Sequence, residues 1–273
     1  KVTINRWIVG EAAAAVAETT TAIEAYRFND AANAVYRFVW NVFCDWYLEL
    51  MKPILTGTDE AAKAETRATA AWVMDQILIL LHPFMPFVTE ELWQKTGERK
   101  QWLIATGWPD YKGLGDAAAD AEMEWVICFI SEVRSVRAEM NVPAGAKIAC
   151  VLVSANSETR RRADAWENEI MRLARLSGLG FEDAVPKASA QIVLGEATVA
   201  LPLEGVIDFA AEKARLAKEL EKIAKDMAGI DGRLNNPGFV AKAPPEVLEE
   251  SRERKAELEA RRAKVDEALA RLG

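Results

Sequence analysis

The chain has 273 residues, of which 51% are hydrophobic, and this apolar content supports folded cores and excludes an intrinsically disordered chain. No run approaches the ~18 apolar residues of a membrane span and no signal peptide opens the chain, so we expect a soluble, cytoplasmic protein without membrane contacts. The first residue is Lys1 rather than Met and lies inside an amphipathic pattern, so we expect a piece of a longer polypeptide.

The net charge of −8, taken alone, argues against a nucleic-acid partner. Residues 208–273, however, hold 14 Lys and Arg and 14 Asp and Glu, so the excess of acid lies wholly in 1–207. Any RNA binding must therefore depend on local patches rather than on bulk charge.

The three cysteines, Cys44, Cys128 and Cys150, are isolated in the sequence. Their spacing suggests neither a disulfide framework nor a Cys-x-x-Cys metal site. We expect no metal, and we expect the thiols to be buried small hydrophobes in a reducing compartment.

Helical periodicity or strong helix formers predict helices over 3–25, 28–51, 59–81, 87–96 and 120–140. Pro53 with Gly57, His82-Pro83 and the loop around Pro109 mark the breaks between them. Together these elements predict a helical bundle over 1–143.

The helix predicted over 28–51 combines an apolar stripe with an unusual polar face. The stripe consists of Phe28, Ala31, Ala32, Val35, Val39, Val42, Phe43, Trp46 and Leu50. On another face Asn29, Asn33, Arg37, Asn41, Asp45 and Glu49 recur every four residues, with Tyr36, Phe38 and Trp40 interleaved. Because an ordinary solvated face would carry Lys and Glu instead of bulky aromatics, this pattern indicates a contact surface.

The periodicity changes after Pro143. Residues 147–153 predict a short strand, 157–176 a helix, and 191–194 with 197–203 a hairpin around Gly195-Glu196. These elements predict a small α/β connector module over 144–205 with a sheet of three or four strands.

Residues 206–273 predict an antiparallel coiled-coil arm. The heptad seam consists of Phe209, Leu216, Leu220, Ile223, Met227, Ile230 and Leu234, followed on the return by Leu248, Leu258, Val265, Leu269 and Leu272. Asn235 to Gly238 and Pro244-Pro245 interrupt the pattern between the two segments, so the helices should fold back on each other. At 1.5 Å per residue each helix would reach roughly 40 Å. The predicted fold class is therefore mainly α.

Several stretches resemble one family. NDAANAVYRFVWNVFCDWYLELMKP at 29–53, HPFMPFVTEELW at 82–93 and VRSVRAEMNVPAG at 133–145 resemble, in order, the anticodon-binding bundle of class I aminoacyl-tRNA synthetases, most closely the valyl branch. LPLEGVIDFAAEKARLAKELEKI at 201–223 and LNNPGFVAKAPPEVLEE at 234–250 resemble the coiled-coil arm of the valyl enzymes. The resemblance covers nearly the whole chain. It implies a monomer that binds tRNA, in particular the valine isoacceptors, and no DNA.

The resemblance also implies that the bundle binds the anticodon loop. The residues expected to do so are Arg27, Phe28, Asn29, Asn33, Arg37, Phe38, Trp40, Asn41, Asp45, Arg134 and Arg137. Unpaired RNA bases stack on aromatic and guanidinium planes and hydrogen-bond to amides along their edges, while Arg134 and Arg137 share a helix face suited to successive phosphates. The alternatives are that Phe38 and Trp40 pack against a neighbouring helix, that Asn29 is an N-cap, and that the arginines form surface ion pairs.

In the resembling family the arm lies against the outer corner of the tRNA. The residues expected to contact it are Lys213, Lys218, Lys222, Lys225, Arg233, Lys242, Arg252, Arg254, Lys255, Arg261 and Arg262. Mixed charge also keeps an ordinary coiled coil soluble, so the charges alone are weak evidence for RNA binding. The length of the hairpin is stronger evidence, because a long hairpin that buries only one narrow seam is suited to reaching a distant partner.

No catalytic site is expected in this chain. Neither the His-x-Gly-His nor the Lys-Met-Ser-Lys-Ser signature of the class I synthetases occurs, nor does a Gly-rich phosphate loop. The single histidine, His82, precedes a proline, where it more readily ends a helix than acts as a base. ATP and Mg are therefore expected in a missing catalytic domain, and no cofactor is expected in this chain.

Two alternatives to the valyl tRNA-binding interpretation remain open. The chain could be the equivalent region of an isoleucyl or leucyl relative, or a coiled-coil scaffold that binds protein.

Overall fold

The computed structural model describes residues 2–236, 238 and 244–271. It separates into two compact units, Lys1–Cys128 and Phe129–Gly273. The division falls inside helix α6 (Ala117–Glu139), earlier than the bundle boundary at 143 that the sequence predicts. The connector and the arm fall in the same unit, so the division into three domains stays a prediction.

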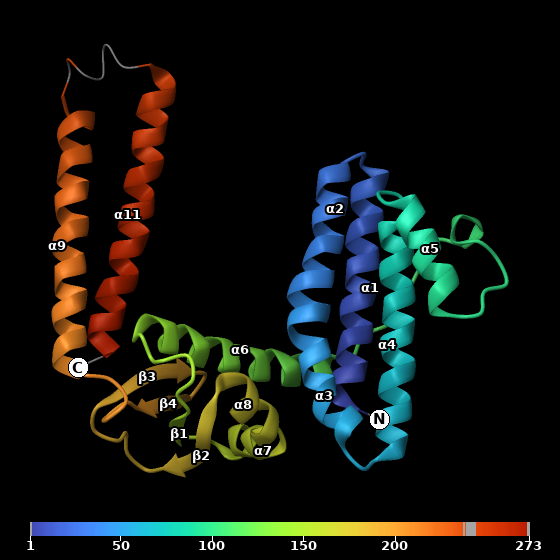
Figure 1. Cartoon of the computed structure of the whole chain (residues 1–273), viewed down its shortest axis with the longest axis horizontal. Helices are drawn as coiled ribbons and strands as arrows, with labels where there is room; N and C mark the ends of the chain where they lie inside the picture. The colour runs from blue at the N-terminus through green and yellow to red at the C-terminus, as the bar shows by residue number, and fades with distance from the viewer. Residues whose placement is uncertain (1, 237, 239–243, 272–273) are drawn as a thin grey trace. The chain divides into compact units, whose positions relative to one another are not determined.

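The first unit is a helical bundle. Its elements are α1 (Thr3–Glu24), α2 (Phe28–Arg37), the π-helix η1 (Phe38–Tyr47), α3 (Leu48–Thr56), α4 (Glu60–Leu81), α5 (Pro86–Thr96), the 3₁₀ turn η2 (Leu103–Ala105) and the first part of α6. Helices α1, α2 and α4 lie side by side (Figure 1). The mainly helical character predicted for this part of the chain is confirmed.

One predicted helix end is wrong, because the second helix continues through Pro53 to Thr56. A proline removes one N–H donor from a helix. The missing N–H of Pro53 lies close to the carboxyl end of α3. There Thr56 Oγ1 donates to the Lys52 carbonyl at 3.0 Å and the Gly57 amide donates to the Ile54 carbonyl at 3.2 Å. The helix therefore ends at Gly57 rather than before the proline.

The π-helix changes which side chains of this segment face the core. Its hydrogen bonds run from residue i to i+5, so inward positions recur at a longer spacing than in an α-helix. Phe38 and Phe43, five residues apart, are 3% and 4% exposed, and Tyr47 stacks on Phe43 with ring centroids 5.7 Å apart. Phe38 therefore lies on the buried face, as the alternative of packing against a neighbouring helix predicts, and not among the exposed residues with which the sequence interleaves it.

The predicted apolar stripe is confirmed in part. Ala31, Val35, Phe43 and Leu50 are buried, and Val39, Val42 and Trp46 are half-buried. Phe28 and Ala32 are exposed, so the stripe is wrong at the start of the helix. The core side of α2 begins at Ala31, one turn later than the periodicity indicates.

A buried polar network holds the π-helix against α1 and α4. The Tyr47 hydroxyl donates to Asn5 Oδ1 at 2.9 Å, and Asn5 Nδ2 donates to Thr66 Oγ1 at 3.1 Å. Glu65 Oε1 accepts from Asn5 Nδ2 at 3.2 Å. Burial raises the pKa of Tyr47 well above its ordinary value, so the phenol keeps its proton and remains a donor. A satisfied buried network fixes local geometry, and here it fixes the rotation of η1.

The second unit carries a mixed sheet with strand order β2-β1-β4-β3. Its elements are β1 (Ile148–Val153), α7 (Ser157–Ala165), α8 (Glu167–Ala174), β2 (Leu176–Glu182), β3 (Ser189–Leu194) and β4 (Ala197–Pro202). Strand β1 pairs with β2 in parallel and with β4 antiparallel, and β3 with β4 is the predicted hairpin. Gly195 lies in its turn at φ 62°, a conformation that favours glycine.

Helices α9 (Phe209–Leu234) and α11 (Pro245–Arg271) form the predicted pair and lie side by side (Figure 1). The buried seam consists of Leu216 and Ile223 on α9 and of Leu258, Val265 and Ala268 on α11. Leu272, also predicted in the seam, lies outside the described residues. Asp208 caps α9 by accepting from the amides of Ala210 and Ala211 at 3.0 Å each. Within the described ranges no helix is both long and apolar enough to cross a bilayer.

Candidate nucleic-acid interface

The turn between α1 and α2 presents two aromatic rings to solvent. Tyr26 has a left-handed backbone (φ 58°), and the amides of Tyr26 and Arg27 donate back to the carbonyls of Ile23 and Ala22 at 2.9 and 2.8 Å. This tight exit leaves Tyr26 82% exposed and Phe28 55% exposed, with their rings edge to face at 6.4 Å. Tyr26 was not among the predicted site residues, although an aromatic residue between two predicted helices is a sign of a contact surface.

The outer face of α2 and η1 carries the predicted mixture of aromatic and amide groups. Trp40 is 53% exposed and Tyr36 59% exposed, with ring centroids 6.4 Å apart. The remaining predicted members of this face, Asn29, Asn33, Arg37, Asn41 and Asp45, are exposed as well. We call Tyr26, Phe28, Asn29, Asn33, Tyr36, Arg37, Trp40 and Asn41 the α2 face.

Several side chains of this region have local partners. Asn29 is not an N-cap: it lies in the first turn of α2, and its Nδ2 donates to Asp30 Oδ1 at 3.1 Å. Arg27 pairs with Asp30 at 3.3 Å, and Arg37 pairs with Glu18 on α1 rather than with Asp45 or Glu49. A hollow of about 390 Å³ between α1 and α2 is lined by both arginines and Asn33.

Arg134 and Arg137, both predicted to bind the anticodon loop, donate hydrogen bonds to backbone carbonyls of the connector, and Arg134 is still exposed while Arg137 is buried. Arg137 is 7% exposed, and its guanidinium donates to the carbonyls of Ala146 at 2.7 Å and Arg175 at 3.2 Å. Burial lowers the pKa of Arg137. Arg134 Nε donates to the Leu173 carbonyl at 3.0 Å. The shared helix face is as the sequence predicts, but Arg137 faces backbone carbonyls and does not present its charge to solvent.

The cations on α11 are largely neutralised by neighbouring carboxylates. The pairs are Arg252–Glu249, Arg254–Glu257 and Arg262–Asp266 within the helix, and Lys255–Asp231 and Arg261–Glu219 across to α9. The cross-helix distances are 2.7 Å each. The two cross-helix pairs hold the hairpin together, and the three intrahelical pairs stabilise α11 itself.

The cations on α9 differ from those on α11. Lys218, Lys222, Lys225 and Arg233 are exposed, and none has a carboxylate within 4.0 Å among the residues that the structure describes. Spacings of four, three and eight residues place all four on one side of the helix. We call them the α9 stripe. Lys213 is exposed near the base of the helix, and Lys242 lies outside the described residues.

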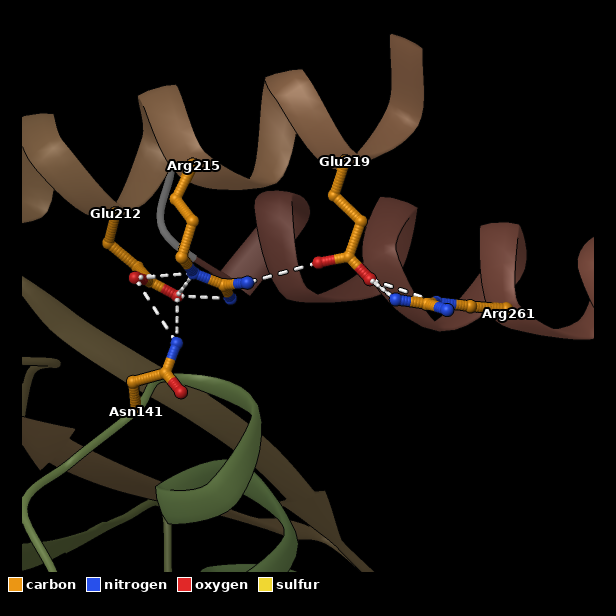
Figure 2. A network of polar contacts seen from close by, with 5 residues as sticks. All are labelled: Asn141, Glu212, Arg215, Glu219 and Arg261. Atoms are coloured by element: carbon orange, nitrogen blue, oxygen red, sulfur yellow. Dashed lines mark hydrogen bonds and ion pairs between the residues drawn. The ribbon is translucent and has the colours of Figure 1, made fainter. Parts of the chain in front are cut away.

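A chain of polar contacts joins the base of the arm to the loop after α6, as Figure 2 shows. Asn141 Nδ2 donates to the buried carboxylate of Glu212 at 3.1 Å, and Arg215 pairs with the same carboxylate at 2.6 Å. Arg215 also reaches Glu219 at 3.0 Å, and Glu219 pairs with Arg261 of α11. Arg261 and Arg215 both hold the pKa of the Glu219 carboxyl below its ordinary value, and Arg261 has the larger effect.

The titratable groups form no arrangement typical of catalysis in the described part of the chain. No group of three His, Cys, Asp or Glu there could hold a metal ion. Burial raises the pKa of the Cys150 thiol to about 12, which suits a core position. Cys44 is half-buried and Cys128 exposed, so burial of all three thiols was wrong for Cys128. His82 Nδ1 contacts Thr89 Oγ1 at 2.8 Å.

Comparison with known proteins identifies the family. Residues 5–153 match the model described as the anticodon-binding domain of tRNA ligase. The chain belongs to this family of tRNA-ligase anticodon-binding domains. Residues 208–273 match the model of the valyl tRNA synthetase tRNA binding arm. The resemblance inferred from the sequence is therefore confirmed, in the valyl form rather than the isoleucyl or leucyl one.

Three similar proteins are valine–tRNA ligases. It is 53% identical to the valine–tRNA ligase of Caulobacter vibrioides over 274 residues, covering 98% of the chain and 30% of that protein. It is 52% identical to the valine–tRNA ligases of Ruegeria pomeroyi and Agrobacterium fabrum, covering 100% and 99% of the chain and 27% and 29% of those proteins. The chain thus spans less than a third of the length of these curated relatives.

Proposed function

We propose that this chain is the tRNA-recognising part of a valine–tRNA ligase, with the α2 face reading the anticodon loop and the arm contacting the outer corner of the tRNA. The observation that carries the proposal is the exposed α2 face within a chain that matches both the anticodon-binding and the arm models over most of its length. The partner is a tRNA of the valine isoacceptors, bound by a cytoplasmic monomer.

The α2 face suits unpaired bases rather than a duplex. Exposed aromatic rings such as Trp40 offer planes for stacking, and amides such as Asn33 and Asn41 can both donate to and accept from base edges. Arg27 and Arg37 are held by exposed carboxylates, and such surface pairs contribute only about 0–1 kcal/mol. A phosphate can therefore displace the carboxylates at small cost.

The arm supplies contacts that are independent of sequence. The α9 stripe presents cations that no neighbouring carboxylate neutralises in the described residues, and phosphate contacts of this kind position a protein without reading bases. The cations of α11 lie in exposed pairs from which a phosphate would first displace a carboxylate, at the same small cost as for Arg27 and Arg37. Within the predicted set of arm residues, the α9 stripe is therefore our choice for the RNA-facing side.

Aminoacylation itself is assigned to the longer protein. The chain lacks the two signature motifs of class I synthetases, so ATP, Mg and valine belong to the part of the ligase that lies outside it. Purified chain should accordingly show no ATP–pyrophosphate exchange above background with valine. Exchange activity in this chain would contradict the assignment.

A binding titration tests the anticodon assignment. The chain is titrated against tRNA carrying the valine anticodon and against the same tRNA with an altered anticodon. Base stacking is worth about 1–3 kcal/mol, so Trp40→Ala should weaken binding of the first tRNA roughly tenfold and erase much of the difference between the two. Phe87→Ala is the matched control, because Phe87 is 90% exposed on α5, outside the α2 face. Equal affinity of the wild type for both tRNAs would refute the proposal.

The salt dependence of binding tests the arm. Replacing Lys218, Lys222 and Lys225 together by Gln should lower affinity for both tRNAs equally. It should also flatten the slope of log affinity against log salt by roughly 0.7–0.9 for each phosphate that is no longer neutralised. The matched control replaces Arg252, Arg254 and Arg262 by Gln, the same change in charge on the paired cations of α11. An equal effect of both triple variants would show that bulk charge, not the α9 stripe, binds the RNA.

A further inference from the structure

The loop that follows α6 has a well-defined backbone, and it presents the side chain of Asn141. Asn141 lies in the left-handed region at φ 49°, which asparagine tolerates better than most residues. Its amide donates to the Ala138 carbonyl at 3.2 Å, and the amide of Val142 donates to the Arg137 carbonyl at 2.9 Å. These two bonds form a Schellman motif at the end of the helix. The buried guanidinium of Arg137 also binds the Ala146 carbonyl in the same loop, so the backbone that carries Asn141 is held on both sides.

The side chain of Asn141 binds a buried carboxylate at the start of the arm (Figure 2). Glu212 lies in the first turn of α9 and is 8% exposed. Its two oxygens accept from Asn141 Nδ2 at 3.1 and 3.4 Å and from Arg215 Nε at 3.1 and 3.0 Å. A buried carboxylate is costly unless it is paired and hydrogen-bonded. An orientation of α9 that separates Glu212 from Asn141 is therefore unfavourable.

The same contacts reach both helices of the arm. Arg215 bridges Glu212 and Glu219 on α9, and Glu219 pairs with Arg261 of α11 at 2.7 Å. Asn141 is the member of this network that lies outside the arm (Figure 2). Its amide therefore joins the end of α6 to the base of the whole hairpin.

A small rotation at the base of the arm becomes a large displacement along it. From Glu212 to Arg233, the last residue of the α9 stripe, the helix rises roughly 30 Å, so a rotation of about 10° moves that end by about 5 Å. This displacement is larger than the ~4 Å within which a cation and an anion form an ion pair. Contacts made by the α9 stripe therefore depend on the orientation of its base.

We propose that Asn141 and Glu212 are positioning residues, whose hydrogen bond holds the arm in the orientation in which the α9 stripe meets tRNA. Both act through the arm and not by contact with the RNA. When the bond is lost the arm samples other orientations, and the apparent affinity falls in proportion to the fraction of molecules in the competent one. The inference rests on the proposed function, since it presupposes that the arm binds tRNA.

An exchange of donor and acceptor tests the bond. Asn141→Asp places a second carboxylate against Glu212 with almost no change in shape, so the arm should be released and tRNA affinity should fall about tenfold. Adding Glu212→Gln restores the pair, because the new amide can donate to the new carboxylate, and it returns the formal charge to that of the wild type. The double variant should bind within about twofold of the wild type, as expected for two coupled residues.

Two single variants separate the bond from folding and from charge. Asn141→Gly keeps the left-handed turn that ends α6 and removes only the amide, so it should also weaken binding while circular dichroism melts show an intact fold. Asn168→Asp is the matched charge control. Asn168 is exposed on α8, and its replacement adds the same charge to the same unit without facing Glu212, so affinity should fall far less than in Asn141→Asp.

A distance measurement without RNA reports the orientation itself. Spin labels are attached at Asp164→Cys on α7 and Glu250→Cys on α11, both exposed positions, after Cys44 and Cys128 are replaced by Ser. Double electron–electron resonance then gives the distribution of distances between the connector and the arm. The distribution should broaden in Asn141→Asp and return to its wild-type width in the double variant.

The outcomes distinguish this inference from the proposed function. An unchanged distance distribution in Asn141→Asp, or a loss of affinity that Glu212→Gln does not rescue, would overturn the inference and leave tRNA binding by the arm intact. Equal losses in Asn141→Asp and Asn168→Asp would assign the effect to charge alone and would also overturn it. A wild-type chain that does not bind tRNA would refute the proposed function, and the positioning role for tRNA would fall with it.

Discussion

Replacing Phe38 by Ala should unfold the bundle more easily without removing an RNA contact. The side chain is 3% exposed, and truncation of a buried Phe to Ala costs about 3–5 kcal/mol in the free energy of unfolding. With a urea m-value of about 2 kcal/mol per M, the midpoint of unfolding should fall by about 1.5–2.5 M. Urea titration followed by circular dichroism measures this shift directly.

For Trp40, two residues after Phe38, we expect the opposite: a small effect on stability and a large effect on RNA binding. It is 53% exposed, so Trp40→Ala should change the free energy of unfolding by about 1 kcal/mol or less. RNA affinity separates the two roles: Phe38→Leu, which roughly keeps the buried volume, should bind tRNA as the wild type does, while Trp40→Ala should bind about tenfold more weakly. A folded Phe38→Leu that binds tenfold more weakly would refute the assignment of Phe38 to the core.

Three further outcomes follow from the structure. Tyr47→Phe leaves the buried Asn5 without its donor and should cost about 1–3 kcal/mol, measured as a lower urea midpoint. Arg137→Met should lower stability by a similar amount, measured in the same way, and leave the salt slope of tRNA binding unchanged, because its guanidinium holds backbone carbonyls. Arg261 holds the pKa of the Glu219 carboxyl in the folded protein below its ordinary value of 4.5, which applies to the unfolded chain. The ionised carboxylate therefore stabilises the arm fully above pH 4.5, and this contribution is lost as the pH falls through the lower pKa of the folded state. Between about pH 6 and about pH 3 the Tm should therefore fall further in wild type than in Glu219→Gln.

The long helices could be predicted from the sequence because their apolar spacing is regular and glycine or proline marks most ends. The π-helix could not. No residue of 38–47 is a helix breaker, and the buried Phe43 and Tyr47, with the bond from Tyr47 to Asn5 of α1, are long-range features that the local sequence does not report. The regular α-helical spacing therefore missed Tyr47, which is fully buried, although counting by four placed Asn33 and Arg37 correctly on the exposed face.

Strand β2 was missed for a related reason. Periodicity predicts one helix over 157–176, but the structure has two, α7 and α8, and Arg175 adopts a left-handed conformation (φ 54°) that ends α8 before the chain pairs in parallel with β1. Gly178 and Gly180 are the local sign of this change, since glycine is unfavourable inside a helix. Parallel pairing across a helical connection is a long-range contact that periodicity alone does not report.

Under the proposed function, the arrangement of charge divides the work of tRNA binding between two surfaces. Residues 1–207 carry the whole net charge of −8, so the bundle as a body repels phosphate and contributes little non-specific affinity. Reading by the α2 face must then come from stacking and hydrogen bonds, which depend on the bases present. The arm is neutral overall, so the exposed cations of the α9 stripe attract phosphate as a local patch and not through bulk charge. Added salt should therefore weaken binding through the arm and leave the ratio of affinities for the two anticodons nearly constant. A ratio that falls towards one as salt is added would show that cations, not aromatic rings, distinguish the anticodons.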